Sequence, residues 1–448
     1  MHTVIIGNGI SGITAARWLR KLGNNKISVI SSESQYFYSR TALMYIYMGH
    51  MREVDTQPYE PWFWEKNRID LKLDHVSNID FKNKLLDCKS GESINYDQLV
   101  LALGSKSNKF GWPGQDLKGV GGLYHLQDLQ NMEEYSKNLK RAVIVGGGLI
   151  GIEMAEMFHA RKIPVSLIVR EGSYWNNVLP DEESQMVTRH IRKHDIDLKL
   201  NSNLGEIIDD GNGTAKGATI KETGEVIDCG YVGLTAGVSP NIGWLKETDL
   251  EINRGILVDE NLQTNISDVY AIGDCAEIRE PKPGRRGIEA IWYTGRMMGE
   301  TVAYNISGNN ISYDPGIWFN SAKFLDIEYQ VYGEMPSSPA DHHANLYWEH
   351  EDGEKSIRIV YNKENNIVLG FNLMGIRFRH EVCEKWILEN TSLDEVLQNL
   401  SLANFDPEFC EQYEKNLLTQ YNKQTGKSIK LKKQRKLDQV LSFLKSRK

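Results

Sequence analysis

The sequence of 448 residues is poor in cysteine and has no long apolar run. Its five cysteines are scattered without a C-x-x-C pair, so we expect no disulfide framework, no zinc cluster and no protein-held iron–sulfur cluster. No segment approaches the roughly 18 apolar residues of a membrane-spanning helix. An apolar strand-like segment from Thr3 reaches glycine by Gly7, which leaves no room for a secretory signal. We therefore expect a cytoplasmic protein with no metal site.

Positive charge is scarce except at the C-terminal end of the chain. The sequence has 52 Lys+Arg against 60 Asp+Glu, a formal net charge of −8. Residues 423–448 contain ten basic residues and one acidic residue, which leaves 42 basic and 59 acidic residues in the preceding part. An acidic body of this kind predicts no nucleic-acid partner.

Two segments repeat one pattern, in which a buried strand is followed by a G-x-G-x-x-G turn and a helix. The first is Val4-Ile5-Ile6-Gly7-Asn8-Gly9-Ile10-Ser11-Gly12, and the second is Ala142-Val143-Ile144-Val145-Gly146-Gly147-Gly148-Leu149-Ile150-Gly151. In such a turn the first glycine makes the bend, the second lets a pyrophosphate approach the backbone, and the third lets helix and strand pack closely. The diphosphate then lies at the helix N-terminus. The expected cofactor-binding glycines are Gly7, Gly9 and Gly12 in the first nucleotide fold and Gly146, Gly148 and Gly151 in the second.

A second pair of motifs supports this repeat. Val100-Leu101-Ala102-Leu103-Gly104 places Gly104 97 residues after Gly7, and Leu234-Thr235-Ala236-Gly237 places Gly237 91 residues after Gly146. The matching spacings predict two dinucleotide-binding folds of the Rossmann type. The residues expected to contact cofactor at these strand ends are Ala102, Gly104, Ala236 and Gly237.

The position that contacts the adenosine ribose differs between the two folds. Glu33 lies 21 residues after Gly12, at the offset of a carboxylate that binds ribose hydroxyls, although it could also be a solvated turn residue. In the second fold Arg170 stands at the corresponding place, where it could bind the 2′-phosphate of NADPH or simply lie at the surface. Glu171 would oppose a phosphate, so the choice between NADH and NADPH stays open.

Together these motifs resemble the FAD- and NAD(P)-dependent pyridine nucleotide–disulfide oxidoreductase superfamily, in particular its ferredoxin/rubredoxin reductase and nitrite reductase flavin-subunit branch. The resemblance covers about residues 1–315 and includes Tyr270-Ala271-Ile272-Gly273-Asp274-Cys275-Ala276. It implies that Asp274 binds the ribityl chain of FAD and that Glu153 lies near the junction of flavin and nicotinamide. Read without the family, Glu153 is a carboxylate near a helix N-terminus, where it is stabilising for other reasons.

The resemblance also implies an α/β fold with two Rossmann-like domains of the glutathione reductase type and a smaller α+β C-terminal domain. The FAD domain would be discontinuous, with the NAD(P) domain inserted into it. The expected domains are 1–115 and 247–314 for FAD, 116–246 for NAD(P), 315–410 for an interface domain that could form a homodimer, and 411–448 for a basic helical tail.

The sequence departs from the disulfide reductases at the position of their redox-active cysteines. No cysteine occurs before Cys88, so dithiol chemistry beside the flavin is not expected. Arg40 matches an arginine that approaches the FAD diphosphate in the ferredoxin reductase branch. Tyr45 stands where that branch often has a lysine near the flavin, so it is a catalytic candidate together with Glu153. Trp292, at the start of a helix expected to point at the flavin, could shield the cofactor or be core packing.

The function implied is that of an FAD-dependent NAD(P)H oxidoreductase. A hydride would pass from NAD(P)H to flavin N5, and electrons would then pass without a cysteine relay to a small carrier such as ferredoxin, rubredoxin or another iron–sulfur protein. One alternative is a peripheral-membrane type II NADH:quinone oxidoreductase, which a weak membrane-surface contact of the basic tail would favour. Another is a non-catalytic redox sensor that binds FAD.

Overall fold

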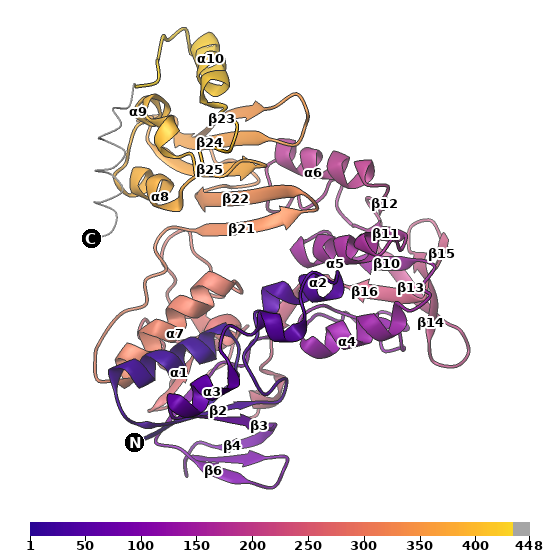
Figure 1. The fold of residues 1–448 in the computed structure, drawn as a ribbon, viewed down its shortest axis with the longest axis vertical. Helices are drawn as coiled ribbons and strands as arrows, with labels where there is room; N and C mark the ends of the chain where they lie inside the picture. Colours follow the sequence, from indigo (N-terminus) through magenta and orange to yellow (C-terminus); the bar gives the residue numbers. More distant parts are fainter. Residues whose placement is uncertain (433–448) are drawn as a thin grey trace. The chain divides into compact units, whose positions relative to one another are not determined.

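A computed structural model describes residues 1–432 of the chain, which form two compact units (Figure 1). The N-terminal unit contains Met1–Ile168 and Ser202–Pro315. The C-terminal unit contains Val169–Asn201 and continues from Gly316. The chain therefore leaves the N-terminal unit after Ile168, returns at Ser202, and leaves it a second time after Pro315.

The first glycine turn belongs to a parallel sheet of the N-terminal unit, with strand order β19-β7-β1-β2-β3. Most apolar residues of its four other strands are buried, as in parallel sheets that helices cover on both faces, whereas the edge strand β3 is partly exposed. The strands are β1 (His2–Ile6), β2 (Lys26–Ser31), β3 (Ile69–Leu73), β7 (Gln98–Leu101) and β19 (Val269–Ala271), and the helices of this fold are α1 (Ile10–Leu22) and α7 (Trp292–Ile306).

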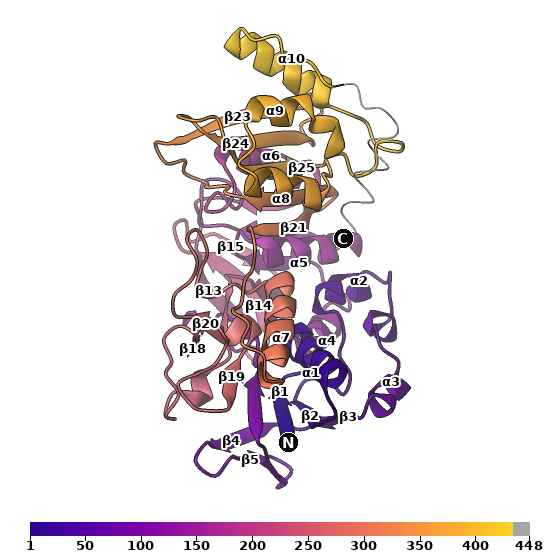
Figure 2. The ribbon, with the colours of Figure 1, turned by 90° about the vertical axis from the view of Figure 1, so that its left-hand side faces the viewer.

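Helices α1 and α7 lie side by side although they are far apart in sequence (Figures 1 and 2). Glycine makes this contact close, because a Cβ atom added to Gly299 would lie 2.4 Å from the carbonyl oxygen of Ser11. Gly295, one turn earlier, faces the same stretch of α1. The small residues bring the N-terminal ends of both helices to the carboxyl edge of the sheet.

The second glycine turn lies in another parallel sheet of the same unit, in which β11, β10, β16 and β9 follow one another. Short strands β8 and β17, which follow Gly104 and Gly237, pair with each other and join the two nucleotide folds. The bounds are β8 (Ser105–Ser107), β9 (Val120–Gly121), β10 (Ala142–Val145), β11 (Val165–Ile168), β16 (Tyr231–Leu234), β17 (Val238–Pro240), α4 (Leu126–Tyr135) and α5 (Leu149–Ala160).

Smaller elements complete the N-terminal unit. Three-stranded antiparallel sheets are formed by β4, β5 and β6 and by β13, β14 and β15, while β18 pairs with β20. The remaining bounds are η1 (Arg40–Ala42), α2 (Leu43–Tyr47), η2 (Glu53–Thr56), α3 (Pro61–Lys66), β4 (Val76–Asp80), β5 (Leu85–Cys88), β6 (Ser93–Asn95), β13 (Leu204–Asp209), β14 (Ala215–Ile220), β15 (Val226–Asp228), η3 (Gly243–Leu245), β18 (Ile256–Val258), η4 (Gly273–Cys275) and β20 (Ala276–Ile278).

The C-terminal unit is built on an antiparallel sheet of order β21-β22-β25-β24-β23. Helix α8 packs on β22 and β25, and an apolar core lies between the sheet and its helices. The bounds are α6 (Asp181–Lys193), β12 (Asp197–Lys199), β21 (Phe319–Phe324), β22 (Ile327–Gly333), β23 (His343–Glu349), β24 (Ser356–Asn362), β25 (Val368–Met374), α8 (His380–Leu388), α9 (Leu393–Gln398), η5 (Leu400–Leu402) and α10 (Glu414–Thr425).

These elements confirm the predicted fold class, with two Rossmann-like folds followed by an α+β domain. The predicted boundaries between the FAD and NAD(P) domains stay a prediction, since both glycine turns lie in one compact unit. Of the predicted tail, α10 and residues 426–432 are described, and residues 433–448 lie outside the described residues. Among the helices of residues 1–432, none combines the length and apolar character needed to cross a membrane.

A buried ion pair attaches α6 to the sheet of the C-terminal unit. Arg358 Nε donates to Glu183 Oε1 at 2.7 Å, and its Nη2 donates to Glu183 Oε2 at 2.8 Å. Asn372 Nδ2 also donates to Glu183, at 3.2 Å. Glu183 is fully buried, and this burial raises its pKa although Arg358 opposes the shift. The carboxylate therefore depends on Arg358 for its charge balance.

We predict that Arg358→Ala destabilises the C-terminal unit by about 3–5 kcal/mol, because Glu183 would be left as a buried carboxylate without its cation. Arg377→Ala is the matched control, since Arg377 pairs with Glu328 at the surface, where loss of an ion pair costs at most about 1 kcal/mol. Urea unfolding followed by circular dichroism measures both. Equal losses in the two variants would contradict this account of Glu183.

Candidate functional site

The carboxyl edge of the first parallel sheet opens into a cavity of about 450 Å³ within the N-terminal unit. The cavity begins at the glycine turn after β1, passes the ends of β2 and β7, and reaches the N-terminal ends of α5 and α7. Nine of the residues predicted from the sequence line it: Gly7, Gly9, Glu33, Arg40, Ala102, Gly104, Glu153, Asp274 and Trp292.

Backbone sterics explain the first glycine turn. Gly7 has φ +112°, and a Cβ atom there would lie 2.1 Å from the carbonyl oxygen of Ala102. A Cβ on Gly12 would lie 2.0 Å from the carbonyl oxygen of Gly7, so Gly12 supports the turn without lining the cavity. Gly9 has open space where its side chain would be. It precedes α1, whose N-terminus has no side-chain cap, so backbone N–H groups face the cavity.

The second glycine turn has the same construction. Gly146 has φ +131°, and a Cβ atom there would lie 2.6 Å from the carbonyl oxygen of Thr235, just after β16. Gly148 has open space and precedes the uncapped N-terminus of α5. Gly151 is buried in the first turn of that helix. This turn does not line the cavity, but Ile150 of α5 does, so the second fold reaches the site of the first.

The Glu33 carboxylate is surrounded by donors from the protein. Arg40 donates to both of its oxygens, at 2.7 and 3.0 Å, and the Leu126 N–H donates to Oε1 at 3.0 Å. Burial raises the pKa of Glu33, but hydrogen bonds from His125, Arg40 and Tyr38 outweigh it, so this pKa lies well below its ordinary value. Glu33 is thus an ionised carboxylate on the cavity wall, as binding of ribose hydroxyls requires. Both of its oxygens already accept hydrogen bonds from Arg40.

Tyr124 was not among the predicted site residues, yet it links two parts of the cavity. Its hydroxyl donates to Asp274 Oδ2 at 2.9 Å and accepts from the backbone N–H of Ser105 at 2.8 Å. Its carbonyl oxygen accepts from Arg40. A Cβ atom on Gly104, which has φ +65°, would lie 2.9 Å from the Tyr124 hydroxyl. Tyr124 belongs to no motif, so the sequence did not identify it. The only related signal was the glycine at 104, which indicates that another group packs closely against that position.

Asp274 and Glu153 are both carboxyl groups whose pKa burial raises. For Asp274 the hydrogen bonds from Tyr124 and Ser105 oppose that increase. For Glu153, burial and then the nearby charge of Glu156 raise the pKa to about 7. A carboxyl group that changes its protonation state near neutral pH, beside a cavity, is a candidate for a functional role.

The N-terminus of α7 forms the far end of the cavity. Ile291 precedes the helix without a side-chain cap, and Trp292, its first residue, lies on the cavity wall. The positive end of the helix dipole therefore faces the cavity. Tyr45 does not line the cavity, and its ring stacks on His50 with 6.2 Å between ring centroids. The structure thus gives Trp292 a place at the site and gives Tyr45 none.

The remaining predicted residues lie apart from the cavity wall. Gly237 has φ +85° and follows β16, and Ala236 accepts a hydrogen bond from Asn108 at 3.3 Å. Arg170 belongs to the C-terminal unit, where its exposed side chain pairs with Glu171 at 2.6 Å. The role of Arg170 in choosing between NADH and NADPH stays a prediction.

No cysteine lines this cavity within residues 1–432. Cys275 follows Asp274, but its sulfur lies 3.3 Å from both the Leu103 nitrogen and the Leu101 oxygen, against the backbone after β7. Burial raises the pKa of this thiol to about 12. Cys275 is therefore a buried thiol bound to backbone groups, and no thiolate relay is available at the site.

The chain belongs to the pyridine nucleotide-disulphide oxidoreductase family. The family's sequence model matches residues 1–299, which contain both glycine turns and the Asp274 motif. NADH-rubredoxin oxidoreductase of Clostridium acetobutylicum is 28% identical over 404 residues, which are 89% of this chain and 98% of that protein. The similarity thus extends beyond the family model into the C-terminal unit.

Solved structures of the family have the same fold. The crystal structure of NADH:rubredoxin oxidoreductase from Clostridium acetobutylicum matches with a TM-score of 0.71 and 26% identity, and the match covers 88% of this chain and 98% of that chain. A NAD-dependent persulfide reductase from A. fulgidus matches with a TM-score of 0.82 at 22% identity, covering 95% and 84% of the two chains. These findings confirm the family predicted from the motifs.

Proteins of this family use FAD with a nicotinamide nucleotide, and the residues around the cavity fit FAD. The open backbone at Gly9 and the uncapped N-terminus of α1 suit a diphosphate. Asp274 offers acceptors for sugar hydroxyls, and the N-terminus of α7 suits a group that becomes negatively charged. Arg40 lies on the cavity wall, where its guanidinium binds Glu33 and the Tyr124 carbonyl oxygen.

We predict that an alanine at Gly9 weakens the binding of FAD, whereas an alanine at Gly148 weakens the binding of NAD(P)H. Gly9→Ala leaves the packing intact but puts a methyl group where the FAD diphosphate would approach, so affinity for FAD falls roughly tenfold or more. Gly148→Ala, its matched control in the second fold, retains FAD but raises KM for NAD(P)H by a similar factor. Flavin absorbance per chain and steady-state kinetics measure these effects. Equal loss of FAD in both variants would contradict the assignment.

We predict that the ionisation of Glu153 makes the stability of the protein depend on pH. Because its pKa of about 7 exceeds the ordinary 4.5, the folded chain keeps a proton that the unfolded chain has released between those values. The free energy of unfolding therefore falls as pH rises from about 4.5 to 7, by at most about 3 kcal/mol, and levels off above pH 7. Glu153→Gln removes this dependence.

Thermal unfolding between about pH 5 and pH 8 tests this prediction. Glu156→Gln is the control, since it removes one cause of the shift and moves the transition of Glu153 to lower pH. A Glu153→Gln variant with the same pH dependence as the parent protein would show that Glu153 ionises normally.

Proposed function

We propose that the protein is an FAD-dependent NAD(P)H oxidoreductase that passes electrons directly to a small iron–sulfur carrier protein. The observation that carries the proposal is the cavity at the first glycine turn, which the helix of the second glycine turn also reaches and which no cysteine lines within residues 1–432. When bound, FAD supplies the chemistry of hydride acceptance and one-electron release.

The residues of the chain bind and orient the two nucleotides. Gly7, Gly9 and Gly12, with the N-terminus of α1, would hold the FAD diphosphate, and Glu33 and Asp274 would hold its sugar hydroxyls. Gly146, Gly148 and Gly151 would hold the nicotinamide nucleotide at the N-terminus of α5. Ala102, Gly104, Ala236 and Gly237 shape the strand ends behind the two turns.

Two features support a reaction at the far end of the cavity, where α7 begins. The N-terminus of α7 would stabilise negative charge there, and Trp292 would cover that end against water. Glu153, with its pKa of about 7, can hold or release a proton where the two nucleotide folds meet. Tyr45 has no support as a catalytic residue, since it stacks on His50 away from the cavity wall.

The choice of acceptor draws on the relatives. The Clostridium acetobutylicum relative is named for rubredoxin, and a Pseudomonas putida relative that is 29% identical over 282 residues is a rubredoxin-NAD(+) reductase. Because no cysteine lines the cavity within residues 1–432, the chain supplies no thiol relay there, and a one-electron carrier protein would be suited to collect the electrons directly. A small carrier protein is therefore the partner that we propose, with NADH or NADPH as the donor.

We predict that NAD(P)H bleaches the flavin anaerobically and that added rubredoxin or ferredoxin then supports reduction of cytochrome c. Iodoacetamide should leave the rate unchanged, because four cysteines are buried and Cys410 is the exposed one among residues 1–432. Cys410→Ser is the control for reaction at that position. Failure of both NADH and NADPH to bleach the flavin, or strong inactivation of the Cys410→Ser variant by iodoacetamide, would overturn the proposed function.

A further inference from the structure

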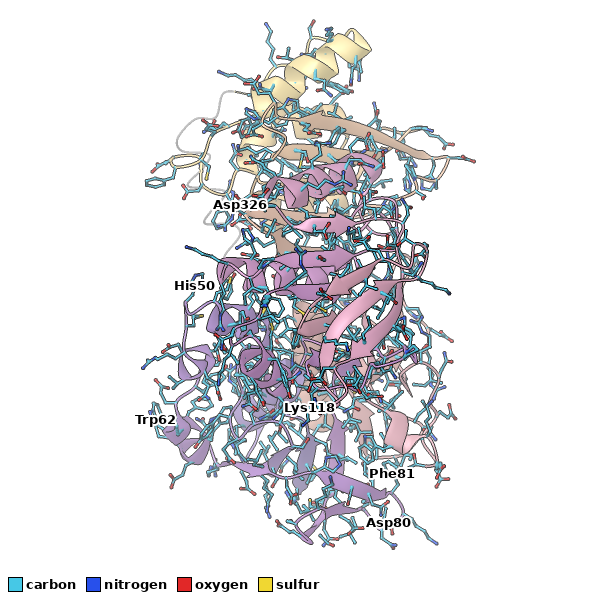
Figure 3. All side chains as sticks on the ribbon, turned by 90° about the vertical axis from the view of Figure 1, so that its right-hand side faces the viewer. His50, Trp62, Asp80, Phe81, Lys118 and Asp326 are labelled. Atoms are coloured by element: carbon cyan, nitrogen blue, oxygen red, sulfur yellow. The ribbon has the colours of Figure 1, made fainter. Side chains whose placement is uncertain are left out.

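Two histidines and a carboxylate converge inside the C-terminal unit. His190 lies near the end of α6 and His194 directly follows this helix, four residues later, so both rings are on one side of it. The rings are 4.5 Å apart between centroids. Asp326, labelled in Figure 3, lies in the turn between β21 and β22. One ligand atom from each of the three residues lies within 4.8 Å of the other two.

The hydrogen bonds determine where the protons are. His194 Nδ1 lies 3.0 Å from the carbonyl oxygen of His190, which can only accept, so Nδ1 carries the proton. The Nε2 atom of His194 is therefore the one that would bind a metal ion, and it lies 3.6 Å from Asp326 Oδ1. His190 Nε2 forms a hydrogen bond with the same carboxylate oxygen. Two imidazole nitrogens thus converge on one carboxylate oxygen, where a metal ion could take the place of the shared protons.

The separation of His194 and Asp326 and the types of ligand match a metal site, whereas His190 Nε2 would have to move away from the Asp326 oxygen to which it is hydrogen-bonded. Two ligand atoms that are each about 2.0–2.1 Å from a tetrahedral zinc ion lie about 3.4 Å apart, close to the 3.6 Å between His194 Nε2 and Asp326 Oδ1. A histidine that binds a metal commonly donates its other N–H to a backbone carbonyl, as His194 does. Two imidazoles and one carboxylate suit zinc and leave one position open.

The neighbouring charges do not oppose a cation. Glu354 Oε1 lies 3.8 Å from His190 Nδ1 and also pairs with Lys193, so the charge of this lysine is balanced by a carboxylate. His190 is buried, whereas the Asp326 side chain is 69% exposed. The site is therefore fixed on the helix side and open to solvent on the Asp326 side.

We propose that His190, His194 and Asp326 bind a divalent transition-metal ion, zinc by the chemistry of the ligands, which fastens the end of α6 to the β21–β22 hairpin. The proposal departs from the expectation from the sequence that the protein has no metal site. Spacing could not suggest it, because Asp326 lies 136 residues after His190 and meets it only in the fold. The proposal is independent of the electron acceptor and of the flavin site.

A second cluster in the same unit provides a comparison. His343 Nδ1 accepts from the backbone N–H of Ala340 at 3.1 Å, so the proton of a neutral His343 is on Nε2. That Nε2 lies 3.2 Å from Glu334 Oε2, at hydrogen-bond distance. No lone pair of His343 faces the carboxylate, although His342 is close by. In this cluster the Nδ1 atom of His343 already accepts a hydrogen bond from the backbone and its Nε2 is bound to Glu334, so His342 serves as a control position.

The test uses the tag-free, FAD-loaded full chain after dialysis against a chelator. Isothermal titration with zinc chloride should show one site per chain. His194→Gln and Asp326→Asn should each weaken zinc binding at least tenfold, whereas His342→Gln should not. These two ligand positions avoid the buried His190, whose replacement could prevent folding. Zinc should also raise the Tm of the parent protein and not that of the His194→Gln/Asp326→Asn double variant.

Three outcomes would overturn the proposal. The parent protein could show no saturable binding of zinc. The double variant could retain both the binding and the Tm increase, which would show that the ion binds elsewhere. Finally, His342→Gln could remove the binding that His194→Gln leaves, which would assign zinc to the second cluster.

Discussion

The contact of glycine backbone with a neighbouring carbonyl is the constraint on which the site depends. At Gly7 and Gly12 a single methyl group would collide with main-chain oxygen, and at Gly146 it would collide with Thr235. These contacts let a helix begin at the edge of a parallel sheet with its N–H groups uncovered. The same condition at Gly299 brings α7 against α1, so that a second helix N-terminus arrives at the same cavity. The geometry of the nucleotide-binding site thus depends on the absence of side chains at these glycines.

Around this backbone frame, the carboxyl groups of the cavity have different protonation behaviour because their surroundings differ. Glu33 has many donors, which hold its pKa low despite burial. Burial and the nearby carboxylate of Glu156 both disfavour the charged form of Glu153, so its pKa rises to about 7. One acidic side chain is therefore suited to permanent hydrogen bonding, and the other to proton exchange. In the C-terminal unit the buried Glu183 depends on Arg358, which makes that carboxylate structural.

Much of the fold could be predicted because its motifs are local and repeated. The two glycine turns and the motif at Asp274 each occupy a short stretch, and their steric requirements leave few choices of residue. Tyr124 escaped prediction because its contacts with Ser105, Arg40 and Asp274 join segments that no motif connects. Tyr45 was proposed because the resemblance places it where related proteins often have a lysine, and in the structure its ring stacks on His50. Its catalytic role stays a prediction, since resemblance gives the position of a residue in the chain and not the direction of its side chain.

The sequence by itself determined the two nucleotide folds, the absence of a cysteine pair near the first of them, and therefore the class of chemistry. These properties depend on residue type over short distances, where glycine, cysteine and apolar spacing act directly on the backbone. Only the tertiary structure decided which carboxylates share donors, which helix ends meet, and that His190, His194 and Asp326 converge. Such sets are assembled by packing between distant segments, and spacing along the chain carries no record of that packing.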